Sequence, residues 1–459
     1  MTATFNVLDY AAAGDGQTND AEAIQKALDA CAAAGGGTVL LPAGRSFLSG
    51  SIRIHSFTEL HVERGAALIA SDREADYPHR VFDTGPEADK RIWIQAVDAE
   101  HIALTGGGVI DGRCMSFVTE TRPDGGFNTH RWRPAMTCFA GCCAVQVREL
   151  TLRDAANWAL HFVGCEDVLV HGVTIRNRRD FPNCDGIDPD HCRNVRISDC
   201  HIEAGDDCIV LKNTDSFRRY GPTENITITG CTLMSTSCAI KIGSESVDAF
   251  RDIVVTGCII KDSNRGIGLQ LRDEGMIEHV LFSDMIIQTR LFGRGWWGAG
   301  EPIYITALPR HADSTVGPLR HVRFRNIACR AENGIYLHGC AQSRPDRILF
   351  DNVSLQIDKT TEHPGGRHDP RPCDMAVTGG GRPIGKPTPW GQCVEATNPG
   401  VFLHSAQKVT MRHFDVEWGE NRPDYYTHAL EAHGVEDLVL DNFHGTAADP
   451  GRYEATMIE

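Results

Sequence analysis

Short segments in which apolar and polar residues alternate dominate the chain, and this period of two predicts β-strands. The segments share one form, in which an apolar alternation leads through a glycine or Asx residue into a second apolar alternation. The form appears at 168–175 (VLVHGVTI), 195–202 (VRISDCHI), 226–233 (ITITGCTL), 253–260 (IVVTGCII) and 280–287 (VLFSDMII). The starts of these segments lie 27, 31, 27 and 27 residues apart. The central Gly or Asx predicts a bend between two strands.

The same form returns after longer insertions. The later copies are 322–329, 348–355, 409–416 and 438–445. Strands of a β-sandwich also alternate, but a sandwich does not repeat at a fixed period, whereas stacked repeats bury apolar faces that no repeat can bury alone. Cys200, Cys231 and Cys258 hold the same place in three units, which predicts an internal stack. We therefore predict an all-β fold, a single right-handed parallel β-helix domain over residues 1–459.

The N-terminal segment departs from this pattern. A short strand is expected at residues 5–10, and one amphipathic helix is predicted at residues 21–33, between the turn sequence GDGQTND and three glycines at 35–37. Terminal repeats of a solenoid need a different outer face. We expect residues 5–50 to form a cap that carries this helix.

Three segments interrupt the repeat and are predicted to be loops on one face. They are 113–133, the Gly- and Trp-rich 292–309, and a long insertion at 358–400. Loops of this length in a compact fold commonly carry function.

The net charge of −16 argues against nucleic acid and anionic membranes as partners, because both favour basic surfaces. No apolar run reaches the length of a membrane span. The first 20 residues lack a basic region followed by an apolar one, so we expect no signal peptide and a cytoplasmic protein. The sequence predicts no particular oligomeric state.

The sequence contains 17 cysteines, a large and odd number, and no CxxC pair occurs among them. Without an export signal, reduced thiols are favoured over a disulfide framework. We predict small, buried, apolar thiols, with no bound metal and no cofactor.

The strongest chemical signal lies between residues 183 and 212 (NCDGIDPDHCRNVRISDCHIEAGDDCIVLK). Asp185 and Asp207 are 22 residues apart, about one coil, and stacked strands lie about 4.8 Å apart. The spacing predicts that Asp185, Asp206 and Asp207 lie close together on one face. Neighbouring carboxylates raise one another's pKa, a cost that indicates a catalytic centre. A calcium site or an Asx-turn ladder is the alternative, and nearby Lys212 and Lys241 count against calcium.

These motifs, with RPAMTCFAGCCAVQVRELTLRDAANWALHF at 133–162, resemble glycoside hydrolase family 28, the polygalacturonase family. The likeness covers roughly residues 5–355. The family's Asn-x-Asp is present at 183–185 and its Asp-Asp at 206–207. The resemblance implies a pectin-lyase-like solenoid, with Asp206 as general acid and with Asp185 and Asp207 holding and deprotonating a water.

Two other motifs of the family are altered. SCA at 237–239 stands where the family has Gly-His-Gly, and GLQ at 268–270 stands where it has Arg-Ile-Lys. In the family this Arg and Lys hold a sugar carboxylate. Basic residues that could replace them from other directions are Lys241, Arg265, Arg272, Arg367 and Arg371.

Further side chains are candidates for substrate contact, although each also has an ordinary structural explanation. Polar candidates can bond sugar hydroxyls or carboxylates, and tryptophans offer flat faces to sugar rings. The candidates are Asn183, Asp188, Lys212, Lys241, Gln270, Arg272, Trp158, His161, Trp296 and Trp297.

Together these features predict an inverting, exo-acting hydrolase of a pectin-related oligo- or polysaccharide. A polysaccharide lyase on the same fold is the first alternative, with a Lys or Arg base and usually calcium. A hydrolase of a non-uronic α-linked glycan and a non-catalytic carbohydrate-binding solenoid are the others. Fold alone does not separate them.

Overall fold

A computed structural model describes residues 3–82, 88–123, 125–293, 295–373, 382–388 and 391–459. The chain divides into two compact units, Met1–Ile209 and Val210–Glu459. Each unit is built mainly from strands that pair in parallel with strands of the neighbouring coils. The prediction of one continuous domain stays a prediction.

The first unit contains three stacks of parallel strands. One stack consists of β1 (Thr4–Asn6), β3 (Gly37–Leu41), β6 (Thr58–Val62), β9 (Glu100–Gly106), β14 (Cys143–Arg148), β17 (Glu166–His171) and β20 (Arg193–Ser198). The second consists of β2 (Asp15–Asn19), β4 (Ser46–Ser49), β7 (Ala67–Ala70), β10 (Val109–Asp111), β15 (Thr151–Arg153), β18 (Thr174–Arg176) and β21 (His201–Ala204). The third consists of β5 (Ile52–Arg53), β8 (Arg91–Val97), β13 (Pro134–Ala140), β16 (Leu160–Val163) and β19 (Ile187–Asp190).

The second unit repeats this arrangement with longer strands. One stack contains β23 (Thr223–Thr229), β26 (Phe250–Thr256), β29 (Ile277–Thr289), β31 (Leu319–Ala331), β33 (Asp346–Ile357), β37 (Val401–Trp418) and β39 (Val439–Gly445). Another contains β25 (Cys238–Ser246), β28 (Arg265–Leu271), β30 (Ile303–Ala307), β32 (Ile335–His338), the start of β37, β38 (Leu430–Glu436) and β40 (Thr456–Ile458). Strands β24 (Thr232–Ser235) and β27 (Ile259–Ser263) add to a third, and β22 (Ile209–Asn213) begins at the unit boundary.

The predicted bend between paired strands is confirmed in both units. Gly172 and Asp199 in the first unit have φ values of 63° and 56°, and Gly257, Asp284 and Asn352 in the second have 63°, 55° and 56°. Gly, Asn and Asp tolerate this left-handed conformation better than other residues, which explains the Gly or Asx at these bends, although the repeat at 409–416 has His413 there, with φ 49°.

The repeats also set the register of the core. Val195 and Ile197 lie directly beside Val168 and Val170 of the preceding coil. In the second unit the ring of Phe324 stacks at 5.2 Å on Phe282 and at 5.0 Å on Phe350. Identical positions on successive coils therefore pack on one another, and the predicted parallel β-helix is confirmed.

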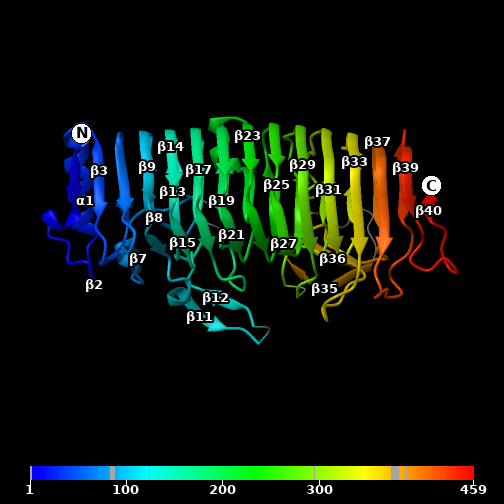
Figure 1. The fold of residues 1–459 in the computed structure, drawn as a ribbon, viewed down its shortest axis with the longest axis horizontal. Helices are drawn as coiled ribbons and strands as arrows, with labels where there is room; N and C mark the ends of the chain where they lie inside the picture. The colour runs from blue at the N-terminus through cyan, green and yellow to red at the C-terminus, as the bar shows by residue number, and fades with distance from the viewer. Residues whose placement is uncertain (1–2, 83–87, 124, 294, 374–381, 389–390) are drawn as a thin grey trace. The chain divides into compact units, whose positions relative to one another are not determined.

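Helix α1 (Ala21–Ala33) has the predicted bounds, and its buried side chains form one face. This face packs against β1, β3, β5 and β6 at the N-terminal end of the first unit (Figure 1). The prediction of a strand at residues 5–10 is wrong after Asn6. Strand β1 ends at Asn6, whose side chain accepts the N–H of Leu8 at 3.0 Å and opens a 3₁₀ turn, η1 (Val7–Tyr10).

Two of the predicted insertions contain small antiparallel sheets. The segment 113–133 holds β11 (Val118–Thr121) and β12 (Phe127–Thr129), and the segment 358–400 holds β34 (Arg367–His368), β35 (Arg382–Thr388) and β36 (Gly391–Glu395). No helix in the described part of the chain is long and apolar enough to cross a membrane.

Candidate active site

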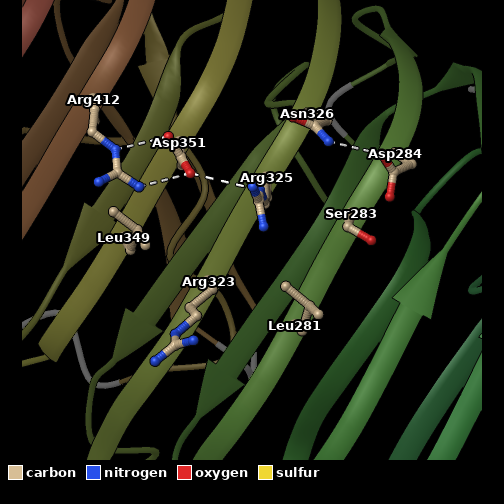
Figure 2. A pocket seen from close by; sticks show the side chains of 9 residues that line it. All are labelled: Leu281, Ser283, Asp284, Arg323, Arg325, Asn326, Leu349, Asp351 and Arg412. Carbon is tan, nitrogen blue, oxygen red and sulfur yellow. Dashed lines mark hydrogen bonds and ion pairs between the residues drawn. The ribbon is translucent and has the colours of Figure 1, made fainter.

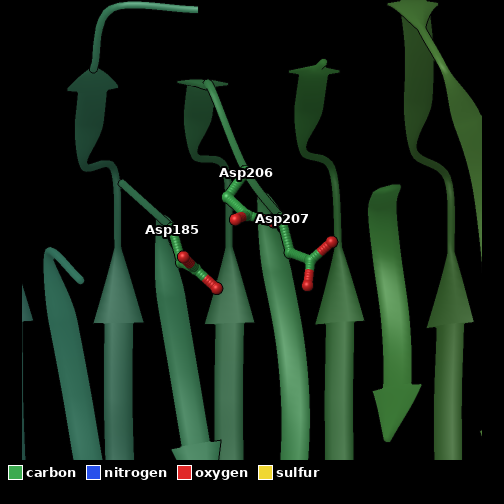
Figure 3. A group of neighbouring side chains, drawn as sticks. All are labelled: Asp185, Asp206 and Asp207. Atoms are coloured by element: carbon green, nitrogen blue, oxygen red, sulfur yellow. The ribbon is translucent and has the colours of Figure 1, made fainter. Parts of the chain in front are cut away.

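Three aspartates of the first unit meet as the sequence predicted (Figure 3). One carboxylate oxygen from each of Asp185, Asp206 and Asp207 lies within 4.8 Å of the other two. Asp185 and Asp207 are only 2% and 1% exposed, whereas Asp206 is half-buried. The spacing of one coil is confirmed by the backbone, since Gly186 N–H donates to Asp207 O at 2.9 Å.

Two glycines allow the coils to approach so closely. A Cβ on Gly186 would lie 2.4 Å from the carbonyl oxygen of Cys208, and a Cβ on Gly205 would lie 2.3 Å from that of Phe181. Any other residue would push the neighbouring segment away. Each glycine adjoins one aspartate of the cluster, Asp185 or Asp206, and so helps to set the distance between them.

Two buried side chains that the sequence analysis missed hold the loop before Asp185. The guanidinium of Arg133 donates to Ala156 O at 2.6 Å and to Asn183 Oδ1 at 2.8 Å. The side-chain amide of Asn177 donates to Cys184 O at 2.9 Å. Arg133 opens the segment 133–162 that carries the family resemblance, but its contact with Asn183 lies 50 residues away. Asn177 reaches Cys184, 7 residues on, and no local pattern reveals either contact.

A small apolar cluster supports this loop from the side of the first insertion. It comprises Cys114, Phe117, Ala156, Phe181 and Cys184, with Val118, Phe127 and Trp132 packed against it. Burial raises the pKa of Cys184 well above its usual range, so this thiol stays neutral beside the acidic cluster. The insertion at 113–133 therefore packs against the loop that carries Asp185.

The other predicted contacts of the first unit lie at different depths. Asn183 is half-buried, with φ 54°, and Trp158 is half-buried with its ring 4.8 Å from that of His161. His161 and Asp188 have no exposed surface, and His161 Nε2 lies 3.5 Å from Asp190 Oδ2. Because both side chains are buried, this arrangement favours a structural role for them between the strands. The substrate-binding role of His161 and Asp188 stays a prediction.

In the second unit, Lys212 and Lys241 lie near a common acid. Lys212 Nζ is 3.9 Å from Glu245 Oε2. Burial alone would raise the pKa of Glu245, but Lys212, Arg310 and Lys241 outweigh it and hold this pKa at about 2. Three cations thus act on the carboxylate of Glu245, and one of them, Arg310, also pairs with Asp273 at 2.8 Å.

The arginines considered as a replacement carboxylate clamp are instead buried within the second unit. Arg272 is 0% exposed and donates to Pro370 O at 3.1 Å and to Thr306 Oγ1 at 2.9 Å. Arg265 is 1% exposed, pairs with Glu301 at 3.1 Å and donates to Asp369 O at 3.1 Å. Their contacts anchor the long insertion to β28 and neighbouring strands, and their expected contact with a sugar carboxylate stays a prediction.

The candidate arginines and tryptophans of the two later insertions also make contacts within the second unit. Arg371 forms a two-point ion pair with Asp369, at 2.6 and 2.8 Å, and its guanidinium lies 5.1 Å from the ring centre of Trp297. Trp296 accepts a bond from Arg371 through its backbone oxygen at 3.0 Å. Arg367, 1% exposed, donates to Pro364 O.

Gln270, the remaining candidate, is 2% exposed on β28. Its Oε1 has no hydrogen-bond donor among the described residues, which leaves an acceptor available to a ligand hydroxyl.

Comparisons with known proteins agree with this geometry. The pattern of "Glycosyl hydrolases family 28" matches residues 77–365, and that of "Rhamnogalacturonase A/epimerase, pectate lyase-like" matches residues 4–66. The chain is 28% identical to a probable polygalacturonase of Vitis vinifera over 77% of this chain and 74% of the relative. It is 22% identical to an exo-poly-alpha-D-galacturonosidase of Dickeya chrysanthemi over 57% and 51% of the two chains.

Solved structures share the fold. The family 28 exopolygalacturonase of Yersinia enterocolitica superposes with a TM-score of 0.70 at 17% identity, covering 95% of this chain and 78% of that one. The exopolygalacturonase of Thermotoga maritima gives 0.63 at 23% identity, covering 77% and 87%. With the family pattern matched over more than half of its length and the three aspartates assembled, the chain is a glycosidase that belongs to family 28 of the glycosyl hydrolases.

Proposed function

We propose that this glycosidase hydrolyses a glycosidic bond in a pectin-related, uronate-containing oligo- or polysaccharide, acting from one end. The observation that carries the proposal is the group of three carboxylates within 4.8 Å on adjacent coils of a family 28 chain. Relatives named polygalacturonase and exo-poly-alpha-D-galacturonosidase support the substrate class and the exo mode.

The different exposure of the three aspartates suggests their roles. We assign to Asp206, the most exposed of the three, the donation of a proton to the oxygen of the leaving sugar. To Asp185 and Asp207, almost fully buried, we assign the holding of a water and the acceptance of its proton as its oxygen bonds to the anomeric carbon. The bond between the anomeric carbon and the leaving oxygen breaks. The sugar that holds the anomeric carbon then carries a new reducing end. Carboxylates this close share protons as a group, so their titration belongs to the cluster.

The closest oxygens lie nearer than the 6.5–9.5 Å between acid and base in two-carboxylate inverting enzymes. The inverting outcome therefore rests on the family resemblance. Proton NMR of the first product tests it, since an inverting enzyme releases the anomer opposite to that of the cleaved bond.

We assign recognition of a sugar carboxylate to Lys212 and Lys241 on their residue type and their sequence position after the Asp-Asp motif. Both lysines lower the pKa of Glu245, and a lysine ammonium can also bind a sugar carboxylate. These lysines would take the part of the family's Arg and Lys, which GLQ at 268–270 does not supply.

A polysaccharide lyase remains the second candidate, because three carboxylate oxygens within 4.8 Å also suit a divalent cation. The experiment offers uronate-bearing and neutral pectic oligosaccharides to the protein and follows both reducing ends and ultraviolet absorbance of unsaturated products. A hydrolase yields reducing ends alone and is indifferent to chelator. Unsaturated products that vanish with chelator would establish the lyase.

Asp206→Asn should lower turnover about 10²–10⁴-fold without loss of fold, because it removes the proton donor. The matched control is Asp199→Asn, an exposed aspartate at a bend with φ 56°, where Asn is equally suited. Near-normal turnover in Asp206→Asn would refute the assigned role.

A further inference from the structure

A surface pocket of about 330 Å³ lies on the second unit, across strands β29, β31, β33 and β37 (Figure 2). Its polar lining includes three arginines, Arg323, Arg325 and Arg412, and two aspartates, Asp284 and Asp351. These side chains come from four successive coils, so the pocket is a product of stacking and has no local sequence signature. None of them belongs to the proposed catalytic machinery.

Arginines on this sheet are commonly neutralised by an acid on the same or the adjacent coil. Arg251 pairs with Glu224 at 2.6 Å, Arg320 with Glu278 at 2.9 Å, and Arg347 with Asp346 at 2.6 Å. Arg323 is the exception within the pocket. It is exposed and has no hydrogen bond or ion pair with any residue that the structure describes.

Apolar side chains flank this unpaired guanidinium. In the strand register, Arg323 lies directly between Leu281 of the preceding coil and Leu349 of the following one (Figure 2). Both leucines are half-buried and line the pocket. They shield the arginine stem and present C–H surface beside its charge.

The other two arginines are fixed by Asp351, which is 9% exposed. Arg412 binds both oxygens of this carboxylate at 2.9 Å, and Arg325 Nε lies 3.6 Å from Oδ2. On the other side, Asn326 donates to Asp284 Oδ1 at 2.9 Å. The pocket thus combines one available cation with held acceptor oxygens and two apolar walls.

We propose that this pocket binds a uronate residue of an acidic saccharide, with Arg323 bonding the sugar carboxylate. A guanidinium and a carboxylate form a strong two-point contact. The leucines match the C–H face of a sugar ring, and Asp284 and Asp351 accept bonds from its hydroxyls. Inorganic phosphate would gain nothing from the leucines and has no sugar ring to bond the two aspartates through hydroxyls, so the saccharide is the better match.

The test measures binding by titration calorimetry, with trigalacturonate as the probe. The Asp206→Asn variant serves as background so that hydrolysis does not interfere. Adding Arg323→Gln should weaken one binding event per chain about tenfold or more, because a charged hydrogen bond is lost. Leu281→Asp, which puts a repelling carboxylate against the sugar, should weaken the same event. Thermal unfolding checks that each variant is folded.

The matched control is Arg347→Gln, which removes an exposed arginine of β33 that already pairs with Asp346. It should leave binding unchanged. The inference is overturned if Arg323→Gln behaves like this control, or if maltotriose or inorganic phosphate binds as tightly as trigalacturonate. The test does not depend on the proposed reaction. A protein that hydrolyses no pectic substrate can still bind trigalacturonate in this pocket, and Arg323→Gln would still weaken that binding.

Discussion

The guanidinium of Arg133 donates a hydrogen bond of 2.8 Å to the side-chain oxygen of Asn183, 50 residues along the chain. The same guanidinium reaches Ala156 O at 2.6 Å and Thr129 Oγ1 at 2.9 Å. Arg133 is 4% exposed. One buried cation therefore ties the first insertion to the loop that carries Asp185, at a point two residues before that aspartate.

Replacing Arg133 by Met should lower kcat about 10–100-fold, because small displacements of catalytic groups are costly. The change should also reduce the free energy of unfolding by about 1–3 kcal/mol, since buried oxygens lose their donor. Steady-state kinetics and denaturant unfolding measure the two effects. Arg153→Met is the control, because Arg153 is half-exposed and pairs only with Asp111 at the surface. Equal kinetics in both variants would contradict the positioning role.

Much of the fold could be predicted because the solenoid repeats its local pattern. Alternating residues defined the strands, and Gly or Asx marked bends that the structure confirms, as at Gly172 and Asp199. The early turn at Val7–Tyr10 was missed, because its cause is a single bond from Leu8 to the side chain of Asn6. The hairpin β11–β12 was anticipated only as an interruption of the repeat.

Gly205 should not tolerate a side chain. A Cβ there would lie 2.3 Å from Phe181 O and 2.6 Å from Arg178 O, so Gly205→Ala must displace the loop beside Asp206. We expect the variant to lose about 1–3 kcal/mol of stability, the usual cost of overpacking, together with activity. Gly293→Ala is the control, because no heavy atom lies within 4 Å of its added Cβ. A stable, active Gly205→Ala would show that the loop yields freely.

The candidate site was predictable only where residues follow one another or lie one coil apart. The spacing of Asp185 and Asp207 placed the acidic cluster correctly. Burial could not be predicted for Arg265 and Arg272, because the loop that covers them is about 100 residues away in the chain. Arg133 was missed for the same reason.

All 17 cysteines are free thiols, and only Cys143 is exposed. Burial raises the pKa of Cys138 and of Cys329 to about 12, so these thiols are unreactive at neutral pH. We expect a thiol reagent to modify about one cysteine in the native protein and all of them after denaturation. The midpoint of thermal unfolding should not change with reducing agent. A midpoint that falls when reductant is added would reveal a stabilising disulfide.

The ion pair of Asp369 and Arg371 should make the second unit sensitive to acid. Both side chains are nearly buried, and Arg371 contacts both carboxylate oxygens of Asp369. Burial alone would raise the pKa of Asp369, but Arg371 and Arg265 and the N–H of Gly298 outweigh it and hold the pKa below its usual value. A carboxyl whose pKa is lower in the folded state stabilises the fold above its unfolded pKa of about 4 and loses this effect as the pH falls below it.

Asp369→Asn leaves Arg371 buried without its counterion, at a cost of about 3–5 kcal/mol at neutral pH. The thermal midpoint of the variant should therefore lie below that of the wild type at pH 7. The difference should begin to shrink as the pH falls below about 4, the unfolded pKa, and should vanish only as the pH falls through the lowered pKa of folded Asp369. Glu245 also titrates in acid, but it is present in both proteins and cancels in the difference. Asp415→Asn, at an exposed position of β37, should give a small difference that does not vary with pH. A difference for Asp369→Asn that stays constant from pH 7 to pH 3 would show that the pair does not control acid stability.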